Sequence, residues 1–385
     1  MVTKPVLVVG AGPAGLAAAA ELRRRGVLAE IIERGDAVAS AWRLRYDRLR
    51  LNTCRWNSRL SGESFPKGTP LFPVRDTWVR YLESYVERHD LPVRFGTQVD
   101  RIDPCDDGWR LTTSTGALTA RHVIVALGQL HTPLMPDWPG LRQYQGRLLH
   151  SAEYRNGEQF RDADVLVAGA GSSAIDIAYD LVRGGAARVR VSVRSQPHML
   201  MRNHGPLPGD LLAMALFAMP TRLADHVSGL MRRWIIGDLA PWGLTAPQEG
   251  MYTHWRRTGR TPTIVNSPVL EAIRTRRFEI VADVSSVTAD EVRLADGTTA
   301  RPDAIIAATG FGTGLEPIAG HLGVLDARGM PRAYGGPAVA PGLRFTGYVA
   351  NIRNLDREGR SVAEQVSREL AMTRAASREL TANLA

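Results

Sequence analysis

The stretch Pro5–Gly15, PVLVVGAGPAG, constrains the fold of this chain more than any other feature. Its short apolar run, Val6–Val9, is typical of a buried parallel strand. Three glycines in the spacing G-x-G-x-x-G follow this run directly, and Ala- and Leu-rich sequence from Leu16 to about Arg25 then predicts a helix. A strand, a glycine turn and a helix in this order predict the first unit of a dinucleotide-binding α/β fold.

The three glycines of this turn, Gly10, Gly12 and Gly15, have separate physical roles in such a fold. The first permits the tight turn, the second leaves room for a pyrophosphate against the backbone, and the third lets helix and strand pack closely. The fold also requires an acidic residue about 20 residues further on, at the end of the second strand. Ala29–Glu33, AEIIE, supplies it, because Glu33 ends a strand-like run where it would hold a ribose hydroxyl.

The second half of the chain repeats the pattern of the first. Ala163–Gly171, ADVLVAGAG, again predicts a strand that runs into a glycine turn, and Ser172–Val182 predicts the following helix. Arg188–Val193 predicts the second strand of this half, and Ala304–Gly310, AIIAATG, resembles the earlier Val123–Gly128, VIVALG. The duplication predicts an α/β protein with two similar Rossmann-like modules, each binding its own dinucleotide.

The second module differs from the first at two points that bear on its ligand. Gly169, Gly171 and either Ser173 or Ala174 stand where the three glycines stood. The second strand of this module ends at Arg194 rather than at an acid, and arginine suits a 2′-phosphate that a carboxylate would repel. We therefore expect FAD in the first module and NADPH in the second. The alternative is that Arg194 is an ordinary surface arginine.

Charge and hydropathy exclude several classes of function. The 385 residues are 44% hydrophobic and 23% charged, as in an ordinary globular protein with room for two domains. The net charge of +9 comes almost entirely from arginine, and no run of basic residues is long enough to form a nucleic-acid-binding arm. The uncharged apolar stretch Leu211–Thr221 is too short to span a bilayer. We therefore expect neither a nucleic-acid partner nor a transmembrane segment.

Two cysteines, Cys54 and Cys105, form no C-x-x-C motif and no disulfide framework. Their number argues for a reducing compartment and against the disulfide-reductase branch of flavoproteins with two dinucleotide sites. A core strand begins a few residues after Met1, so we expect no signal peptide and a cytoplasmic location. We expect no metal site.

The order of these elements predicts a discontinuous first domain. Residues 1–157 and 310–385 would form the FAD domain, and residues 158–309 the NADPH domain, with a helical insert at about 197–267. Within the insert, Leu207–Leu239 is apolar and helical in pattern. A helical lid or subdomain packed on the nucleotide module is the favoured interpretation of the insert. A surface helix that touches a membrane or an apolar substrate is the alternative.

Tyr144–Tyr154, YQGRLLHSAEY, lies between the modules and resembles the identifying motif of the flavin-containing monooxygenases, which are class B flavin-dependent monooxygenases. Tyr144 replaces the usual Phe, Gly146 and His150 match, and Tyr154 closes the motif where Baeyer–Villiger enzymes usually have Trp. The segments GAGPAG, YDRLRLNT, PLMPDWPG, GAGSSA and AATGF also occur in family order.

The stretch from MPTRLAD through IIGDLAPWGLTAP to GRTP is similar to the YUCCA-type branch of this family, which acts on indole-3-pyruvate. Leu127 is a departure, because the family's first ATG motif has Thr at this position. The departure puts one local contact in doubt and leaves the expected fold unchanged.

The resemblance implies an FAD monooxygenase that depends on NADPH and O2. In such enzymes NADPH reduces the flavin, the flavin forms a C4a-(hydro)peroxyflavin with oxygen, and a small molecule is oxygenated at nitrogen or sulfur or, as a 2-oxo acid, is oxidatively decarboxylated. A Baeyer–Villiger monooxygenase and a non-catalytic FAD/NADPH redox sensor are the alternatives. The substrate and the oligomeric state do not follow from the sequence.

The resemblance also assigns candidate site residues. Asn52 matches a family asparagine beside the flavin, where its amide would donate a hydrogen bond to the peroxide. His150 is the second catalytic candidate, with a contact to the linker or to NADP and a hinge role favoured over acid–base chemistry. The residues expected to contact the cofactors are Gly10, Gly12, Pro13, Ala14, Gly15, Glu33, Arg34, Trp42, Gly169, Gly171, Ser172, Ser173, Arg194, Thr309, Gly310 and Gly347.

Overall fold

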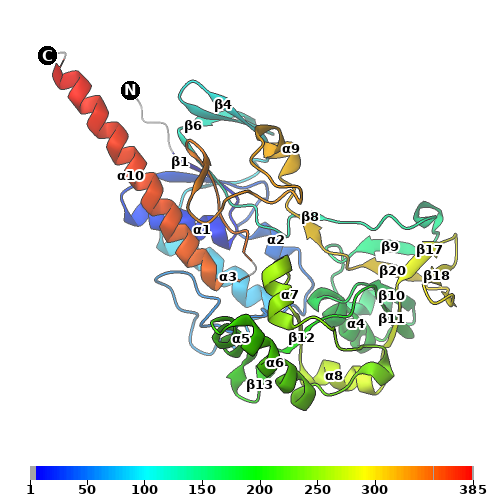
Figure 1. Cartoon of the computed structure of the whole chain (residues 1–385). Helices are drawn as coiled ribbons and strands as arrows, with labels where there is room; N and C mark the ends of the chain where they lie inside the picture. The colour runs from blue at the N-terminus through cyan, green and yellow to red at the C-terminus, as the bar shows by residue number, and fades with distance from the viewer. Residues whose placement is uncertain (1–5, 350, 384–385) are drawn as a thin grey trace.

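A computed structural model describes residues 6–349 and 351–383, with side chains as far as residue 375. Two separate sheets with helices packed on their faces form two α/β modules, as Figure 1 shows. The first sheet has six strands in the order β22-β23-β7-β1-β2-β3, all parallel except β22. Its strands are β1 (Val6–Val9), β2 (Ala29–Ile32), β3 (Val93–Arg94), β7 (His122–Val125), β22 (Ala338–Ala340) and β23 (Leu343–Phe345).

The centre of this first sheet is β1, whose four residues are all buried. Helix α1 (Pro13–Arg24) follows the glycine turn and begins three residues before the predicted Leu16. Proline at the first helical position explains the earlier start, because its fixed φ favours helix and its missing N–H needs no partner there. Helices α1, α3 (Arg75–Arg88) and α10 (Arg353–Asn383) cover one face of this sheet and share one apolar core with it.

The region 93–105 contains two strands that belong to different sheets. β3 ends at the edge of the first sheet, and β4 (Val99–Cys105) begins a separate antiparallel sheet with β5 (Gly108–Thr113) and β6 (Gly116–Ala120). Gly96 lies between the two strands with φ of 65°. This left-handed residue ends β3 and redirects the chain. β5 and β6 form a hairpin that turns just before Gly116.

The second sheet is entirely parallel, in the order β16-β11-β10-β20-β9. Helix α4 (Ser172–Gly184) follows its glycine turn as α1 follows the first one, and α4 packs in one apolar core with α8 (Ser267–Arg274). A small antiparallel sheet covers the opposite face. The strands are β9 (Arg147–His150), β10 (Asp164–Ala168), β11 (Arg188–Val193), β16 (Glu279–Ala282) and β20 (Ala304–Ala307), with β17 (Val284–Val287), β18 (Val292–Leu294) and β19 (Thr299–Ala300) in the small sheet.

One strand lies in a different module from the one expected. Residues 147–150, which the expected boundary at 157 assigns to the first domain, form β9 and pair with β20 in the second sheet. The chain therefore leaves the first sheet before Arg147. It returns with β23, which pairs with β7, and the first module is discontinuous as expected.

The two connections between the modules run side by side. β8 (Thr132–Pro133) on the outgoing connection pairs antiparallel with β21 (Phe311–Gly312) on the returning one. Figure 1 shows β8 between the two halves of the molecule. Short helix α9 (Glu316–Ala319) follows the return and packs against the β4 sheet.

The insert forms a helical subdomain that contacts both modules. The apolar stretch expected as one helical region is divided by Pro220 into α5 (Gly209–Phe217) and α6 (Thr221–Ile235). These helices pack with α7 (Met251–Thr258) around a small core of their own. Among the residues that the structure describes, no helix is long and apolar enough to cross a membrane. The insert also contains the short strand pairs β12 (Met199–Met201) with β15 (Thr263–Val265), and β13 (Asn203–His204) with β14 (Leu207–Pro208).

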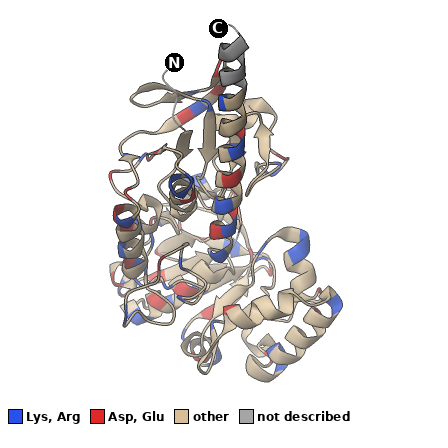
Figure 2. Cartoon of the chain, turned by 90° about the vertical axis from the view of Figure 1, so that its left-hand side faces the viewer, with Lys and Arg blue, Asp and Glu red and all other residues tan. Residues whose placement is uncertain are grey.

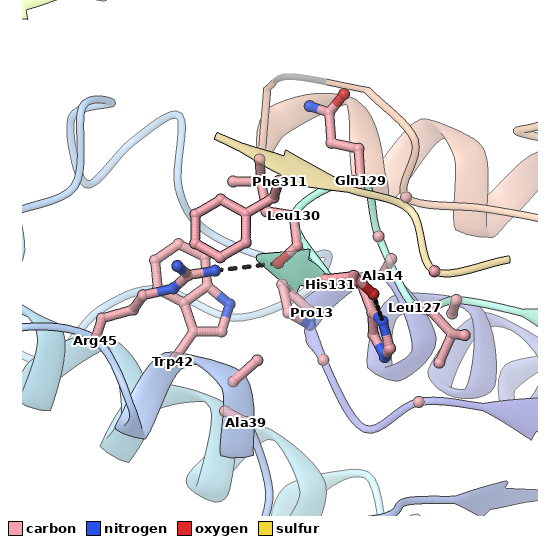
Figure 3. Close-up of a pocket in the computed structure, with 18 of the residues that line it drawn as sticks. Pro13, Ala14, Ala39, Trp42, Arg45, Leu127, Gln129, Leu130, His131 and Phe311 are labelled. Atoms are coloured by element: carbon pink, nitrogen blue, oxygen red, sulfur yellow. Dashed lines mark hydrogen bonds between the residues drawn. The ribbon is translucent and has the colours of Figure 1, made fainter. Parts of the chain in front are cut away.

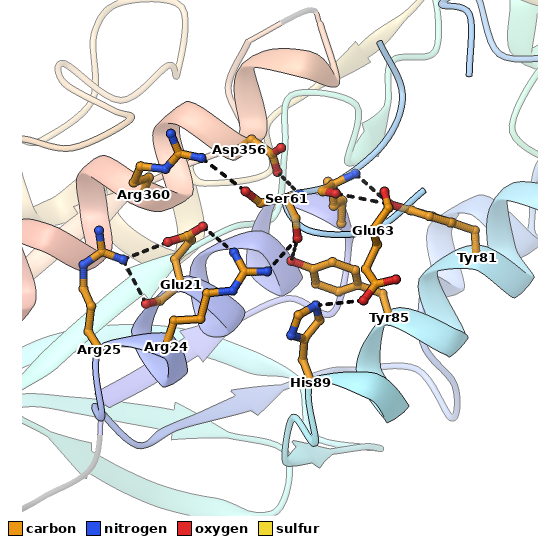
Figure 4. A network of polar contacts seen from close by, with 11 residues as sticks. Glu21, Arg24, Arg25, Ser61, Glu63, Tyr81, Tyr85, His89, Asp356 and Arg360 are labelled. Atoms are coloured by element: carbon orange, nitrogen blue, oxygen red, sulfur yellow. Dashed lines mark hydrogen bonds and ion pairs between the residues drawn. The ribbon is translucent and has the colours of Figure 1, made fainter. Parts of the chain in front are cut away.

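The last helix, α10, lies along α1. Gly359 lets the two helices approach, because a Cβ there would lie 2.9 Å from the carbonyl carbon of Ala17. Figure 2 shows acidic and basic residues interspersed along α10. Asp356 accepts a hydrogen bond of 2.6 Å from the Ser61 N–H, within a polar network that also includes Glu21 of α1 (Figure 4). The network ties the end of the chain to its beginning.

Candidate functional site

A cavity of about 950 Å³ lies between the two modules. Its walls come from the glycine turn after β1, the loop after β2, the segment 49–53, the ends of β7 and β20, and the N-terminus of α4. Figure 3 shows part of this wall, where side chains from several connections converge. The cavity therefore brings both glycine turns to one space. Of the residues expected at the site, it is lined by Gly10, Gly12, Pro13, Ala14, Glu33, Arg34, Trp42, Asn52, Gly171, Ser172, Ser173, Gly310 and Gly347.

The first glycine turn presents an open backbone to the cavity. A Cβ at Gly12 would meet nothing within 4 Å, and no side chain caps the N-terminus of α1 at this residue. Gly10 has φ of 111°, which an L side chain rarely adopts. A Cβ at Gly15 would collide with the carbonyl oxygen of Gly10. The turn thus combines tight packing beneath it with unobstructed N–H groups above it, the arrangement that a pyrophosphate requires.

Glu33 has a role that the sequence did not indicate. It is 8% exposed and lines the cavity, and its carboxylate accepts hydrogen bonds from the N–H of Ala11 at 2.8 Å and of Gly35 at 2.9 Å. The carboxylate therefore braces the glycine turn in addition to any contact with a ribose.

The second glycine turn has the same open geometry. A Cβ at Gly171 would meet nothing within 4 Å, and no side chain caps α4 there. The Ser172 hydroxyl accepts a hydrogen bond of 2.9 Å from the Ile264 N–H, and the Thr263 hydroxyl donates one of 2.7 Å to the Ala170 carbonyl. The strand β15 of the insert thus holds the second turn in shape.

Five expected site residues lie outside the cavity wall. Gly15 and Gly169 form the packed base of their turns. Arg194 is exposed at the end of β11, and the Thr309 hydroxyl donates to the Leu134 carbonyl at 2.5 Å. The fifth is His150, at the end of β9.

His150 links the parallel strands β9 and β20 at the ends where the two connections between the modules attach. His150 is buried, with 1% of the residue exposed. Its Nδ1 accepts a hydrogen bond of 3.1 Å from the Ala152 N–H, and its Nε2 lies 3.0 Å from the Gly310 carbonyl oxygen. With Nδ1 accepting, Nε2 carries the proton and donates to Gly310. Burial lowers the pKa of His150, and the contact with Gly310 opposes this shift. The geometry is that of a neutral brace between the connections rather than of an acid or base facing the cavity.

The other residues of the motif YQGRLLHSAEY hold β9 against its neighbours. Tyr144 donates a hydrogen bond of 2.5 Å to the Pro302 carbonyl. Gly146 is tightly packed, because a Cβ there would lie 2.5 Å from Cζ of Tyr144 and 2.8 Å from the Asp303 carbonyl oxygen. Tyr154 is fully buried and donates a hydrogen bond of 2.7 Å to Asp180 of α4. The motif therefore anchors the connection on the second module.

Asn52 lies where the first module meets a buried polar cluster of the second. Its Oδ1 lies 3.3 Å from Nη2 of Arg202, which is 6% exposed and also lies 3.4 Å from Asp176 Oδ2. Tyr46 donates a hydrogen bond of 3.1 Å to the same Asp176 oxygen. Burial raises the pKa of Asp176 even though Arg202 opposes this shift, and burial together with Asp176 raises the pKa of Tyr46.

Sequence reasoning did not identify this cluster. Asp176 and Asp180 are four residues apart on α4 and share one face, and Arg48 pairs with Asp180 at 3.2 Å. Two acids at this spacing on the helix that follows a glycine turn are a signal that was available in the sequence. Arg202 carried no such signal, because it lies 150 residues from Asn52 in the chain.

Three arginines, Arg34, Arg45 and Arg50, line the cavity, against two acids, Glu33 and Asp100. The guanidinium of Arg45 lies 4.4 Å from the centre of the Phe311 ring, and its Nη2 donates to the Leu130 carbonyl at 3.1 Å (Figure 3).

His131 lies on the same wall, where burial, with a contribution from the charge of Arg34, lowers its pKa to about 4. A neutral imidazole leaves the arginines as the cationic groups of this wall. The cavity therefore favours anions.

These features define a class of protein. Two Rossmann-like modules each offer an open helix N-terminus to one shared cavity, which is the arrangement of an oxidoreductase that passes electrons between two bound dinucleotides. Within the described part of the chain, no group of three or more His, Cys, Asp or Glu side chains is placed to hold a metal ion.

Comparison with known proteins agrees with this class. A family profile described as pyridine nucleotide-disulphide oxidoreductase matches residues 7–204. Indole-3-pyruvate monooxygenase YUCCA1 of Oryza sativa subsp. japonica is 38% identical over 79% of this chain and 76% of its own length, and the probable indole-3-pyruvate monooxygenase YUCCA4 of Arabidopsis thaliana is 31% identical over 85% and 80%. The chain therefore belongs to the YUCCA-type flavin monooxygenases within the pyridine nucleotide-disulphide oxidoreductase family.

Solved structures share the fold. The flavin-containing monooxygenase from Stenotrophomonas maltophilia has a TM-score of 0.75 at 23% identity and covers 96% of this chain and 100% of its own. The bacillithiol disulfide reductase from Bacillus cereus has a TM-score of 0.69 at 20% identity, covering 95% and 99%. The cysteines here, Cys54 and Cys105, are unpaired. The protein is a flavin-dependent monooxygenase that uses a pyridine nucleotide and acts on a small molecule.

Proposed function

We propose that this chain binds FAD on its first glycine turn and NADPH on its second, and that it oxidatively decarboxylates a 2-oxo acid with an aromatic side chain, such as indole-3-pyruvate. The observation that carries the proposal is the single cavity of about 950 Å³ onto which both open glycine turns face. The names of the YUCCA1 and YUCCA4 relatives, indole-3-pyruvate monooxygenase and probable indole-3-pyruvate monooxygenase, at 38% and 31% identity, support the substrate class.

The assignment of the two cofactors rests on the residues at the ends of the second strand of each module. Glu33 follows β2 and suits ribose hydroxyls, whereas Arg194 follows β11 and suits a 2′-phosphate. Arg194 is exposed directly after β11, where its guanidinium would bind the 2′-phosphate.

The charge of the cavity favours a 2-oxo acid over a protonated amine. Three arginines and two acids line it, and both carboxylate oxygens of Glu33 already accept backbone hydrogen bonds. Arg45 and Arg50 are the candidates to bind the substrate carboxylate, and the Phe311 ring beneath Arg45 offers an apolar surface to an aromatic side chain.

The proposed reaction is balanced. One 2-oxo acid, one O2, one NADPH and one proton give one carboxylic acid with one carbon fewer, one CO2, one NADP⁺ and one water. The C1–C2 bond of the substrate breaks, C2 gains one oxygen atom, and the other oxygen atom leaves as water.

The residues of this chain bind and shield the reactants. Bound FAD would supply the transfer of two electrons from NADPH to O2. The N–H groups at the start of α1 and α4 would hold the pyrophosphates, and apolar side chains such as Leu49 and Leu51 exclude water from the cavity. The Asn52 amide would donate a hydrogen bond to the oxygen that is transferred.

Product analysis with the purified holoprotein tests the proposal. The flavin is released and identified, and NADPH and NADH are compared as reductants of the holoprotein with indole-3-pyruvate, a tertiary amine, a sulfide and a cyclic ketone. Catalase is essential, because hydrogen peroxide decarboxylates 2-oxo acids without an enzyme. We expect FAD, a preference for NADPH, and indole-3-acetic acid that still forms with catalase present. The proposal would be contradicted by formation of an ester from the ketone, or by an oxide of the amine or sulfide without any acid from indole-3-pyruvate. It would also be contradicted if the acid no longer formed once catalase was added.

We also propose a cytoplasmic location. The unpaired Cys54 and Cys105 support it, because oxidising compartments favour paired cysteines. Recovery of the native protein in a membrane or secreted fraction would contradict it.

A further inference from the structure

We propose that Arg202 is a positioning residue that orients the Asn52 amide, so that the two N–H donors of the amide face the cavity. The inference rests on the proposed function, in which Asn52 donates to the transferred oxygen. It assigns a role to a residue of the insert, from the other module.

The contact between the two side chains decides which way the amide points. Nη2 of Arg202 lies 3.3 Å from Oδ1 of Asn52. A guanidinium has five N–H donors and no acceptor, so the atom of the amide that faces it must be the oxygen. The NH2 group of Asn52 then points away from Arg202, and Asn52 is an exposed residue on the cavity wall.

Without Arg202, nothing among the described residues would distinguish the two ends of the amide. Within the described part of the chain, the Asn52 side chain makes its hydrogen bond with Arg202. An amide that rotates freely presents its carbonyl oxygen to the cavity for part of the time, and that oxygen repels another oxygen atom. Orientation is therefore a separate requirement from the presence of the asparagine.

Arg202 is itself held firmly at its backbone. Its N–H donates a hydrogen bond of 2.7 Å to the Val265 carbonyl of β15, and its carbonyl accepts one of 2.8 Å from the Gly209 N–H at the start of α5. The guanidinium lies 3.4 Å from Asp176 on α4. The second module thus sets the orientation of a side chain that belongs to the first.

Burial of the Arg202 guanidinium has an energetic cost. It is 6% exposed, yet its Nε has no hydrogen-bond partner in the described part of the chain. Burying an unpartnered donor costs about 1–3 kcal/mol. An apolar side chain here would avoid this cost but would leave Asp176 without its charged partner, so the buried arginine serves both Asp176 and the Oδ1 of Asn52.

The test measures the rate at which hydrogen peroxide is released during NADPH oxidation when no substrate is present, which requires no knowledge of the substrate. Four proteins are compared: wild type, Arg202→Met, Asn52→Ala and the double variant. We expect each single variant to raise the rate of peroxide release about tenfold, as loss of one ordinary hydrogen bond does. The double variant should release peroxide no faster than Asn52→Ala, because the guanidinium has no amide left to orient.

Two further variants separate orientation from general damage. Arg48→Met removes another arginine that pairs with α4, through Asp180, and it does not touch Asn52. We expect it to leave peroxide release unchanged. Arg202→Lys keeps a cationic donor and should recover part of the wild-type behaviour.

The outcomes also separate this inference from the proposed function. The inference is overturned if the effects of the two substitutions multiply in the double variant, or if Arg202→Met behaves like Arg48→Met. The proposed function still stands in either case if the wild type converts indole-3-pyruvate with one NADPH consumed for each molecule of acid. A wild type that converts every NADPH to peroxide, with or without indole-3-pyruvate, overturns both.

Discussion

Gly12 and Gly15 belong to the same turn, yet a methyl group added at each would meet different surroundings. At Gly12 it would project into open space, and at Gly15 it would collide with the Gly10 carbonyl. We expect Gly12→Ala to fold with wild-type stability and to purify with little flavin, because the methyl group occupies the space for a pyrophosphate. Flavin content and the melting temperature of the apoprotein are the measurements.

Gly15→Ala is the matched comparison. We expect it to lower the melting temperature of the apoprotein by several degrees, because helix and strand must separate to admit the methyl group. Equal melting temperatures of the two apoprotein variants would contradict these separate roles of Gly12 and Gly15.

Arg194 tests the assignment of the second nucleotide. It is exposed at the end of β11, outside the cavity wall, so its removal should leave folding intact. We expect Arg194→Ala to raise the KM for NADPH about tenfold and to leave the KM for NADH unchanged, because only NADPH carries a 2′-phosphate.

Arg188 is the control for Arg194, since it lies at the opposite end of the same strand and pairs with Glu279. Arg188→Ala should leave both KM values unchanged. An Arg194→Ala protein that keeps its preference for NADPH would make Arg194 an ordinary surface residue.

At the scale of elements, Tyr154 connects β9 and α4 through one buried hydrogen bond. Its hydroxyl donates to Asp180 at 2.7 Å, and the Gly157 N–H donates to the same oxygen at 3.0 Å. We expect Tyr154→Phe to lower the free energy of unfolding by about 1–3 kcal/mol, because a buried carboxylate loses a partner. Denaturant unfolding measures this change.

Tyr179 on α4 provides the comparison, because its hydroxyl has no hydrogen bond to any described residue. Tyr179→Phe should change the free energy of unfolding by less than about 0.5 kcal/mol. Equal losses in the two variants would mean that the Tyr154 hydroxyl does not stabilise the connection.

The elements divide into those that local sequence predicts and those that it does not. The strand–glycine–helix units were predictable because apolar runs and glycines act over a few residues, as at Val6–Gly15. The module to which β9 belongs was not, because a four-residue apolar run pairs equally well with either sheet and only β20 decides. The contact of Arg202 with Asn52 could not be predicted from the sequence either, because tertiary packing alone brings the two residues together.

At the scale of the whole molecule, buried neutral histidines make stability depend on pH. His122 of β7 is 4% exposed, and burial lowers its pKa from 6.5 to about 4. Because the folded value lies below the unfolded one, the unfolded chain binds the proton first as the pH falls through 6.5. The free energy of unfolding therefore decreases between pH 6.5 and 4, with about 3 kcal/mol lost at the lower end for this residue.

Replacing this histidine should remove part of that dependence. We expect His122→Phe to flatten the curve of unfolding free energy against pH between 7 and 4.5, relative to wild type. His226→Gln, at an exposed position of α6, is the control and should leave the curve unchanged. Parallel curves for wild type and His122→Phe would contradict the account.

The central claim is that the nucleotide of one module and the flavin of the other meet in one cavity and deliver an oxygen atom to a small molecule. Turnover of indole-3-pyruvate with NADPH under ¹⁸O2, in the presence of catalase, tests it most directly. The account predicts one ¹⁸O atom in each molecule of indole-3-acetic acid and one NADPH consumed for each. Acid without label, or NADPH consumed without acid, would contradict it.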